Sequence, residues 1–455
     1  MIAWLIAAIA STLPAPMPPR FEPTACRAPE AVPNAICGTV RVPENRSRPG
    51  GRRIGLKVVV LKPKAPARHP ALFDIDGGPG LPSTKNLGFY AGNGVSNERD
   101  VVMVDQRGTG GSNGLMCPKL SAVPNTEPML PPGLVADCLK SLSRQADVRF
   151  YGTADAAADL DAVRRALGYR QIDLIGLSYG TTVALAYLRD YPTRVRAAVL
   201  MGVAPPQAMP PRAHATAAQR ALDLALADCA ASPACHARFP NLGATLAAAK
   251  ARHPRPELLM ERFRTLLYTP QGRANLPLAI TGAAAGSTQG LFGGAPPGGP
   301  LYADGMFLAV TCGESFALMD YAANAAAARN TQFGDYRLRA QRAACAGWPP
   351  VRLSPNHLKL PTRTEAAVLL ISGEMDPVTP PEWADTVAKA MKHARHVVIP
   401  GGGHVHDGLA NSESCLDTLT NPFLDHGDLA KVDVSCVAGM KAPDYVAPAR
   451  ETDDE

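Results

Sequence analysis

Ser178 is the central residue of a pentapeptide, Gly-Leu-Ser-Tyr-Gly at 176–180, that suits a nucleophile. An apolar run at 172–177 predicts a buried strand before it, and the apolar spacing after residue 181 predicts a helix. A serine on such a tight turn holds its hydroxyl above the edge of a sheet. Gly176 and Gly180 suit this turn because a Cβ at either position would collide with the neighbouring strand or helix. We therefore expect a nucleophile, and an ordinary loop that contains a serine is the alternative.

An acid and a base follow Ser178, in the chain order Ser, Asp, His that is expected when the serine lies on such a strand-to-helix turn. Serine is a weak nucleophile at neutral pH and needs a base to take its proton. His404 follows a predicted strand at 396–400 and a run of glycines, and Asp376 follows a predicted strand at 366–372. Asp376 would fix the tautomer of the imidazole and stabilise the imidazolium. The sequence predicts the triad Ser178, Asp376 and His404, with Glu374 and His406 as the competing acid and base.

Backbone N–H groups for a developing oxyanion are expected from two loops. A predicted strand at 71–75 runs into Asp-Gly-Gly-Pro-Gly at 76–80, where a substrate oxygen could approach without side-chain obstruction. Pro79 has no N–H, so Gly78, Gly80 or Leu81 would donate from this loop. Tyr179, the residue after the nucleophile, would donate the second N–H. The alternative is a tight loop with no catalytic role.

The elements that must position these groups form two α/β blocks around a helical segment. Further strands are predicted at 38–42, 54–61, 100–105 and 196–201, and helices at 154–167 and 383–391. Alternating strands and helices predict a mostly parallel sheet with helices on both faces. Residues 113–150 are expected to be irregular. The glycine-rich turn at 106–112 lacks the spacing of a dinucleotide or phosphate loop and is interpreted as structural.

Strand signals nearly vanish between residues 207 and 350, where alanine-rich helices are expected at 214–229, 242–251, 257–267, 276–285 and 317–328. A helical insert between two α/β blocks is typical of a cap that roofs a pocket and selects substrates. With 455 residues the chain exceeds the ~250–300 at which a single core stops growing. The expected units are a leader at 1–20, the core at 21–206 and 351–455, and the cap at 207–350.

Export is expected from the leader and the cysteines. The apolar start of the chain fits a secretory signal, although a basic n-region is missing, and a buried N-terminal helix is the alternative. Ten cysteines suggest disulfides in a secreted or periplasmic protein. Sequence alone leaves their connectivity open, and local pairing is the simplest expectation: Cys26 with Cys37, Cys117 with Cys138, Cys229 with Cys235, Cys312 with Cys345, and Cys415 with Cys436.

The net charge of +6 is spread along the chain without a dense basic block, so no nucleic-acid partner is expected. No stable membrane insertion is expected, because the apolar start is too short to span a bilayer. Cys229, Cys235 and His236 make a poor zinc pattern that lacks a second pair of ligands. We expect neither a metal nor a cofactor, and the oligomeric state stays open.

Several motifs together resemble a known family: Gly-Gly-Pro-Gly at 77–80, Asp-Gln-Arg-Gly-Thr-Gly at 105–110, Gly-Leu-Ser-Tyr-Gly-Thr at 176–181, Asp-Pro-Val-Thr-Pro at 376–380 and Gly-Gly-Gly-His at 401–404. The chain resembles exported α/β-hydrolases of the prolyl aminopeptidase and tripeptidyl aminopeptidase type over nearly its whole mature length. The resemblance implies an α/β-hydrolase fold with an inserted helical cap. It also implies a serine exopeptidase that acts at the free amino end of peptides.

The same resemblance assigns roles to individual residues. Ser178, Asp376 and His404 would form the triad, and the loop at 77–80 would bind the oxyanion. Glu314, in Thr-Cys-Gly-Glu at 311–314, matches a cap carboxylate that holds the substrate's ammonium group, whereas an exposed glutamate at a helix start is the alternative. Leu81 follows the glycine run where the family usually continues it, which would alter access to the pocket.

Three functions follow from these patterns. The first is an aminopeptidase that releases residues from short peptides through an acyl-enzyme. The second is a carboxylic ester or lactone hydrolase, since acyl transfer to water needs the same groups. The third is a non-catalytic binding protein on the same scaffold, which would be expected to lack a member of the triad. None is lacking here, so the two enzyme functions are favoured.

Overall fold

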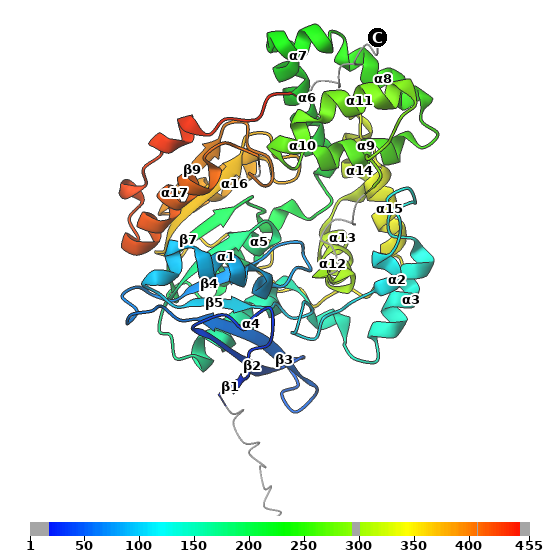
Figure 1. Ribbon diagram of the computed structural model, residues 1–455. Coiled ribbons are helices and arrows are strands. Elements are labelled where there is room, and N and C mark those ends of the chain that lie inside the picture. Colours follow the sequence, from blue (N-terminus) through cyan, green and yellow to red (C-terminus); the bar gives the residue numbers. More distant parts are fainter. Residues whose placement is uncertain (1–17, 294–300, 407, 446–455) are drawn as a thin grey trace, which may run out of the picture.

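A mixed sheet organises the part of the chain that the structure, a computed structural model, describes: residues 18–293, 301–406 and 408–445. The expected leader lies almost wholly outside the described residues. The nine strands run in the order β1-β2-β3-β5-β4-β6-β7-β8-β9 (Figure 1). Their bounds are β1 Phe21–Thr24, β2 Ala35–Pro43, β3 Arg53–Leu61, β4 Leu72–Ile75, β5 Val101–Val104, β6 Ile172–Leu177, β7 Val195–Met201, β8 Ala367–Gly373 and β9 Ala394–Ile399.

The first strands differ from the rest in direction. β1, β2, β3 and β5 pair antiparallel in succession, whereas every pairing from β5 across to β9 is parallel. The expectation of a mostly parallel sheet is therefore confirmed. β1 was not predicted, because this four-residue edge strand is largely exposed, contains a proline and has no apolar alternation.

Helices cover both faces of the sheet, as the alternation of side chains along each strand requires. Val102 and Val104 face the core that contains α4 (Thr153–Ala166), α5 (Tyr179–Asp190) and α16 (Pro381–Ala390). Val101 and Met103 face the opposite core, which contains α1 (Leu87–Gly92) and α17 (Ser412–His426). The near-continuous apolar runs of the parallel strands follow from this burial on both sides.

The carboxyl ends of β4, β6, β8 and β9 meet at one edge of the sheet, because these strands belong to its parallel part. The loops that follow them hold Gly77, Ser178, Asp376 and His404. In an open α/β sheet this edge is where ligands bind. The fold thus brings together four segments that are far apart in the sequence.

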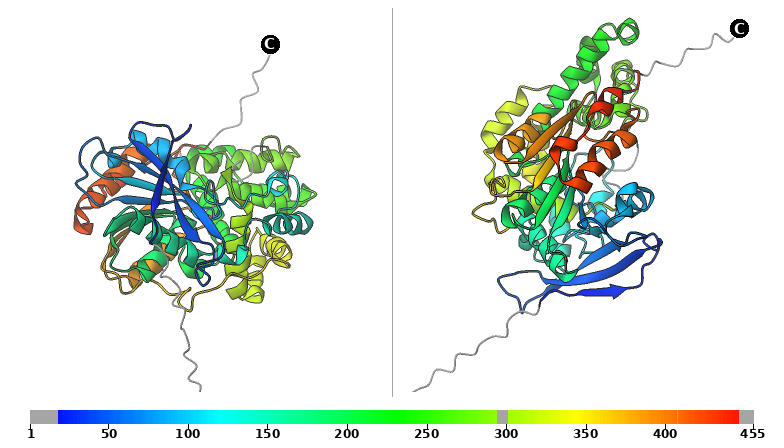
Figure 2. Two further views of the ribbon diagram at one scale, coloured as in Figure 1. Left: turned by 90° about the horizontal axis from the view of Figure 1, so that it is seen from below. Right: turned by 90° about the vertical axis from the view of Figure 1, so that its left-hand side faces the viewer.

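The segment between β7 and β8 is helical in the described residues, and its first part lies at the opposite end of the molecule from the first strands (Figures 1 and 2). We call it the helical insert. Its helices are α6 His214–Ala231, α7 Pro233–Arg238, α8 Leu242–Arg252, α9 Pro256–Leu266, α10 Pro270–Ala274, α11 Leu276–Ala285, α12 Asp304–Val310, α13 Phe316–Leu318, α14 Tyr321–Arg329 and α15 Tyr336–Cys345. Helices α6 to α9 and α11 share a core of their own, whereas Met306 and Leu308 of α12 pack into the main core.

Two expectations about helices were wrong. The single helix expected at 317–328 is divided between α13 and α14, and a π-helical turn, Thr311–Ser315, precedes α13. The break follows Leu318, and Asp320 starts α14 by accepting the Ala323 N–H at 3.1 Å. Residues 113–150, expected to be irregular, contain α2 (Pro118–Ser121) and α3 (Pro132–Leu142).

All ten cysteines form disulfides, in the five neighbouring couples. Such usage indicates an oxidising environment, as in the periplasm or outside the cell. The helices of the described ranges include none whose length and hydropathy would allow a membrane crossing.

Candidate active site

Ser178 occupies the turn between β6 and α5 with a strained backbone. Its φ of +53° is rare for a residue with a side chain. The turn is held because the Ser178 N–H donates to Met201 O at 2.9 Å, and Thr181 donates both its N–H and its hydroxyl to Ser178 O. A Cβ at Gly176 would lie 3.0 Å from Gly180 O, and one at Gly180 would lie 2.0 Å from Ile75 O. The close approach of β6, α5 and β4 therefore requires both glycines.

The structure brings Ser178, His404 and Asp376 together in one line of hydrogen bonds. His404 Nε2 lies 3.0 Å from Ser178 Oγ, and His404 Nδ1 lies 2.8 Å from Asp376 Oδ2. Glu374 instead accepts the Gly401 N–H at 2.9 Å, and His404 rather than His406 contacts the serine. This geometry allows the imidazole to take the serine proton while the carboxylate holds the other ring nitrogen.

Asp376 is fully buried and held by its own loop. Its Oδ1 accepts the N–H groups of Val378 and Thr379 at 2.7 and 2.8 Å, and its Oδ2 accepts the Thr379 hydroxyl at 2.6 Å. Burial alone would raise the pKa of Asp376, but the charge of His404 and these hydrogen bonds lower it below its ordinary value. The aspartate is thus kept ionised where it can stabilise a positive imidazole.

The glycine loop after β4 lies directly against Ser178. A Cβ at Gly77 would lie 2.8 Å from Ser178 Cβ and 3.4 Å from Tyr179 N. The Gly77 N–H already donates to Asp76 Oδ1 at 2.6 Å, and the Leu81 N–H donates to Gly77 O at 3.3 Å. Gly78, at φ +109°, and Gly80 are then the loop residues whose N–H groups stay candidates, together with Tyr179 at the start of α5.

The turn at 105–112 supports this loop, as the structural interpretation expected. Gln106 Nε2 donates to Asp76 O at 2.8 Å. Asp105 accepts the N–H groups of Thr84 and Gly111 at 3.0 and 2.9 Å. These contacts tie the strand ends of β4 and β5 together.

Glu314 lies in the π-helical turn after α12 and is buried, so the alternative of an exposed glutamate is wrong. Its two oxygens accept the N–H and the hydroxyl of Thr153, at 2.5 and 2.6 Å. The Thr153 hydroxyl also lies 3.0 Å from the Tyr179 hydroxyl, so Glu314 is connected to the residue after the nucleophile. Its contact with a substrate ammonium group stays a prediction.

Sequence reasoning missed two neighbours of the hydrogen-bonded residues Ser178, His404 and Asp376. Thr379 bridges it, with its hydroxyl 3.1 Å from His404 Nδ1, and it stands in the Asp-Pro-Val-Thr-Pro motif, which is the signal that could have found it. Tyr268 comes from the helical insert and packs edge-on against the His404 ring, with centroids 5.4 Å apart. No sequence pattern marks Tyr268.

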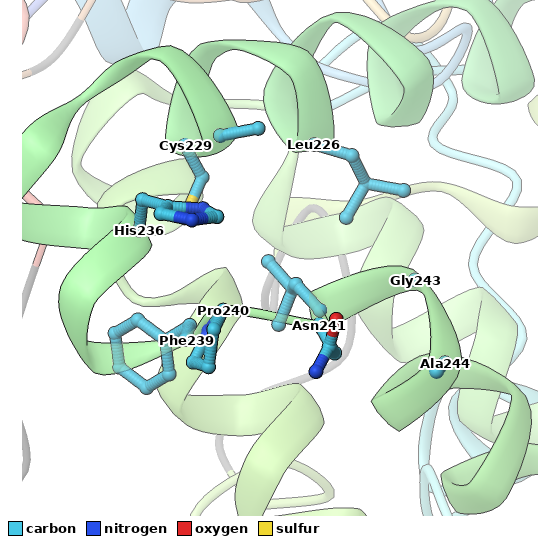
Figure 3. Close-up of a pocket in the computed structure, with 10 residues that line it drawn as sticks. Leu226, Cys229, His236, Phe239, Pro240, Asn241, Gly243 and Ala244 are labelled. Carbon is cyan, nitrogen blue, oxygen red and sulfur yellow. The ribbon is translucent and has the colours of Figure 1, made fainter.

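A cavity in the helical insert lies apart from these residues. It has a volume of about 270 Å³ and is lined by α6, α7 and α8, with Leu226, His236 and Phe239 among its walls (Figure 3). Cys229 and His236 lie close together there, but Cys229 is in a disulfide with Cys235. The described residues contain no group of histidine, cysteine and acidic side chains arranged to hold a metal ion.

Comparison with known proteins gives relatives of two kinds. Over 228 residues the chain is 31% identical to serine protease Hip1 of Mycobacterium tuberculosis, a match that covers 44% of this chain and only 42% of that protein. Carboxylesterase B of the same organism is 28% identical, and the match covers 88% of this chain and 86% of that protein. Tripeptidyl aminopeptidase of Streptomyces coelicolor is 26% identical, and the match covers 90% of this chain and 85% of that protein.

A family model described as the alpha/beta hydrolase fold matches residues 77–406. The match begins at the glycine loop and ends just beyond His404, so it spans every segment that meets at the carboxyl edge of the sheet. The protein belongs to the alpha/beta hydrolase family.

Proposed function

We propose that the protein is an exported serine aminopeptidase that releases residues from the free amino end of short peptides. The observation that carries this proposal is the line of hydrogen bonds from Ser178 through His404 to Asp376. The tripeptidyl aminopeptidase that aligns over 90% of the chain favours a peptide substrate. The disulfides favour export, and residues 1–20 would be the leader.

In the proposed reaction His404 takes the proton of Ser178 as the hydroxyl attacks the carbonyl carbon of the scissile bond. The oxyanion that forms is stabilised by the N–H of Tyr179 and by Gly78 or Gly80. His404 then gives its proton to the departing amine, which leaves an acyl-enzyme. Water, deprotonated by the same histidine, releases the acid and restores the serine. Ionised Asp376 stabilises the imidazolium in both halves.

A carboxylic ester or lactone hydrolase is the second candidate. The carboxylesterase that aligns over 88% of this chain favours it, and the same triad would serve. A non-catalytic role has no comparable support, because the three side chains are in hydrogen-bonding contact.

Release of arylamine from alanyl and prolyl arylamides, each with a free and an acetylated amino group, tests the proposal. Cleavage of the free-amine substrates alone would support an aminopeptidase. Hydrolysis of aryl esters without cleavage of any arylamide would support the second candidate.

The Ser178→Ala protein is the control for both candidates. We expect kcat to fall by about 10⁴-fold or more with no change in the far-ultraviolet circular dichroism, because the nucleophile is lost and the fold is kept. Wild-type turnover in this variant would contradict either hydrolytic function.

A further inference from the structure

A set of charged side chains from the helical insert lies next to the triad. Tyr268, just after α9, packs against His404, and its carbonyl accepts the Val405 N–H at 3.1 Å. Arg264 donates to the Tyr268 hydroxyl at 2.9 Å, and its guanidinium carbon is 5.3 Å from the centre of the Tyr268 ring. A single aromatic ring thus stands between this guanidinium and the imidazole.

A second guanidinium, that of Arg337 on α15, joins the first through a shared carboxylate. Glu261 on α9 is buried and accepts from Arg264 Nε at 3.1 Å and from Arg337 Nε at 3.1 Å. Among the described residues, Glu261 is the carboxylate that pairs with either arginine. The two guanidiniums and one carboxylate carry a net charge of +1, and Arg262 adds another positive charge nearby.

Arg337 also lies within electrostatic range of the other side of the site. Tyr302 packs against the glycine loop, with a ring carbon 3.4 Å from where a Gly80 Cβ would stand. Burial raises the pKa of Tyr302 and the negative charge of Asp304 raises it further, whereas the positive charge of Arg337 lowers it. Arg264 therefore lies near the histidine through Tyr268, and the charge of Arg337 acts on the tyrosine that packs against the glycine loop.

The neighbouring histidine does not add to this charge. Burial lowers the pKa of His214, on α6, and the charges of Arg337 and Arg264 lower it further, so this imidazole stays neutral. One guanidinium nitrogen of each arginine, Nη2 of Arg264 and Nη1 of Arg337, donates no hydrogen bond to the described residues. A mostly buried surplus positive charge with unused donors is stabilised when an anion binds it.

We propose that Arg264 and Arg337 form an anion-binding position beside the triad and that the substrate carries a carboxylate which docks there. The inference rests on the proposed function and names its substrate class. The carboxylate has two possible sources: the carboxyl terminus of a short peptide, on the leaving side of the scissile bond, or an acidic group on the acyl side. A guanidinium recognises either one by paired, charge-assisted hydrogen bonds.

Two matched pairs of substrates distinguish these sources. Alanyl-alanine and alanyl-alanine amide differ only in a carboxylate on the leaving side. The aryl monoester of glutarate and the aryl ester of valerate have acyl chains of the same length, and only the glutarate ester carries a carboxylate on the acyl side. We expect the wild type to prefer the carboxylate member of one pair by about 10- to 100-fold in kcat/KM, as for a charged hydrogen-bonded pair.

The preference should fall to within about threefold in Arg337→Gln, because the docking donor is lost. Arg339→Gln is the matched control: Arg339 lies on the same helix, is exposed and pairs with Asp335 at 2.8 Å, so this variant should keep the wild-type preference. The ratio is measured within one preparation, so a smaller folded fraction does not change it. If Arg337→Gln does not fold, Glu261→Gln, which frees both guanidiniums, should retain or increase the preference.

Equal rates on both members of each pair in the wild type would overturn the inference and leave the proposed function standing. An unchanged preference for the carboxylate substrate in Arg337→Gln would also overturn the inference. The two arginines would then have a structural role, which is to hold α9 and α15 together through Glu261. If the wild type cleaves no arylamide, peptide or ester, the proposed function itself fails and the inference fails with it.

Discussion

Glu314 shows how a single buried carboxyl can link the helical insert to the nucleophile's neighbour. Its hydrogen bonds go to Thr153, His357 Nε2 lies 3.9 Å from its Oε2, and no arginine or lysine of the described residues pairs with it. Burial raises the pKa of Glu314 to about 7, although the hydrogen bonds from Thr153 limit the rise. An acid whose pKa is higher in the folded chain than in the unfolded chain binds its proton more tightly when folded. The free energy of unfolding therefore decreases as the pH rises from about 4.5 to about 7.

Glu314→Gln should remove this dependence, because glutamine has the shape of the protonated acid and can still meet both Thr153 groups. Relative to the wild type, the variant should gain about 2–3 kcal/mol of unfolding free energy between pH 5 and pH 8. Burial also raises the pKa of Asp74 to about 7. Its contribution to the pH dependence is the same in the wild type and in the variant, so it cancels in the difference between them. Urea unfolding at the two pH values measures the difference, and an equal difference at both would contradict it. A role in holding the substrate's ammonium group would appear separately, as a higher KM for free-amine substrates.

At the scale of elements, the turn between β6 and α5 depends on how closely α5 approaches β4. A Cβ at Gly180 would lie 2.0 Å from Ile75 O, which is backbone and has no room to move. We expect Gly180→Ala to destabilise the fold by about 3 kcal/mol and to abolish activity by displacing Ser178. Gly243, exposed in α8 with nothing within 4 Å of its Cβ position, is the control. Gly243→Ala should stabilise by about 0.5–1 kcal/mol, because alanine is the better helix former. Denaturant unfolding of both variants measures the change in unfolding free energy, which should be a decrease for Gly180→Ala and an increase for Gly243→Ala.

The same scale separates what the sequence could predict from what it could not. Most of the parallel strands were predictable because they are apolar runs, and the site followed because Ser178, Asp376 and His404 lie in the loops just beyond predicted strands. The contacts of Tyr268 and the burial of Glu261 were not predictable, since they depend on how α9 and α15 pack above the sheet. The helix expected at 317–328 was wrong because its alanine-rich composition suggested one continuous helix, although Asp320, which caps the start of α14, marks the break.

At the scale of the whole molecule, each disulfide closes a short segment, and none of the five links the helical insert to the α/β core. The two cysteines of each pair are 6 to 33 residues apart in the sequence. Cys229–Cys235 and Cys312–Cys345 lie within the helical insert, Cys117–Cys138 joins α3 to the residue before α2, and the other two lie within the α/β core. The insert and the core are instead held together by packing, as where α12 enters the main core.

Reduction should therefore loosen every part of the molecule at once. Each disulfide of this loop length contributes about 2–4 kcal/mol, mainly by restricting the unfolded chain. Spread over a chain of 455 residues, the loss of all five should lower the melting temperature by on the order of 10 °C. Calorimetry with and without a phosphine reductant measures the shift, and a thiol assay on the same sample must find the ten released thiols. The oxidised form of the reductant serves as the control. Ten free thiols with an unchanged melting temperature would mean that packing alone stabilises the fold, and the argument from the cysteines to an exported protein would lose its physical basis.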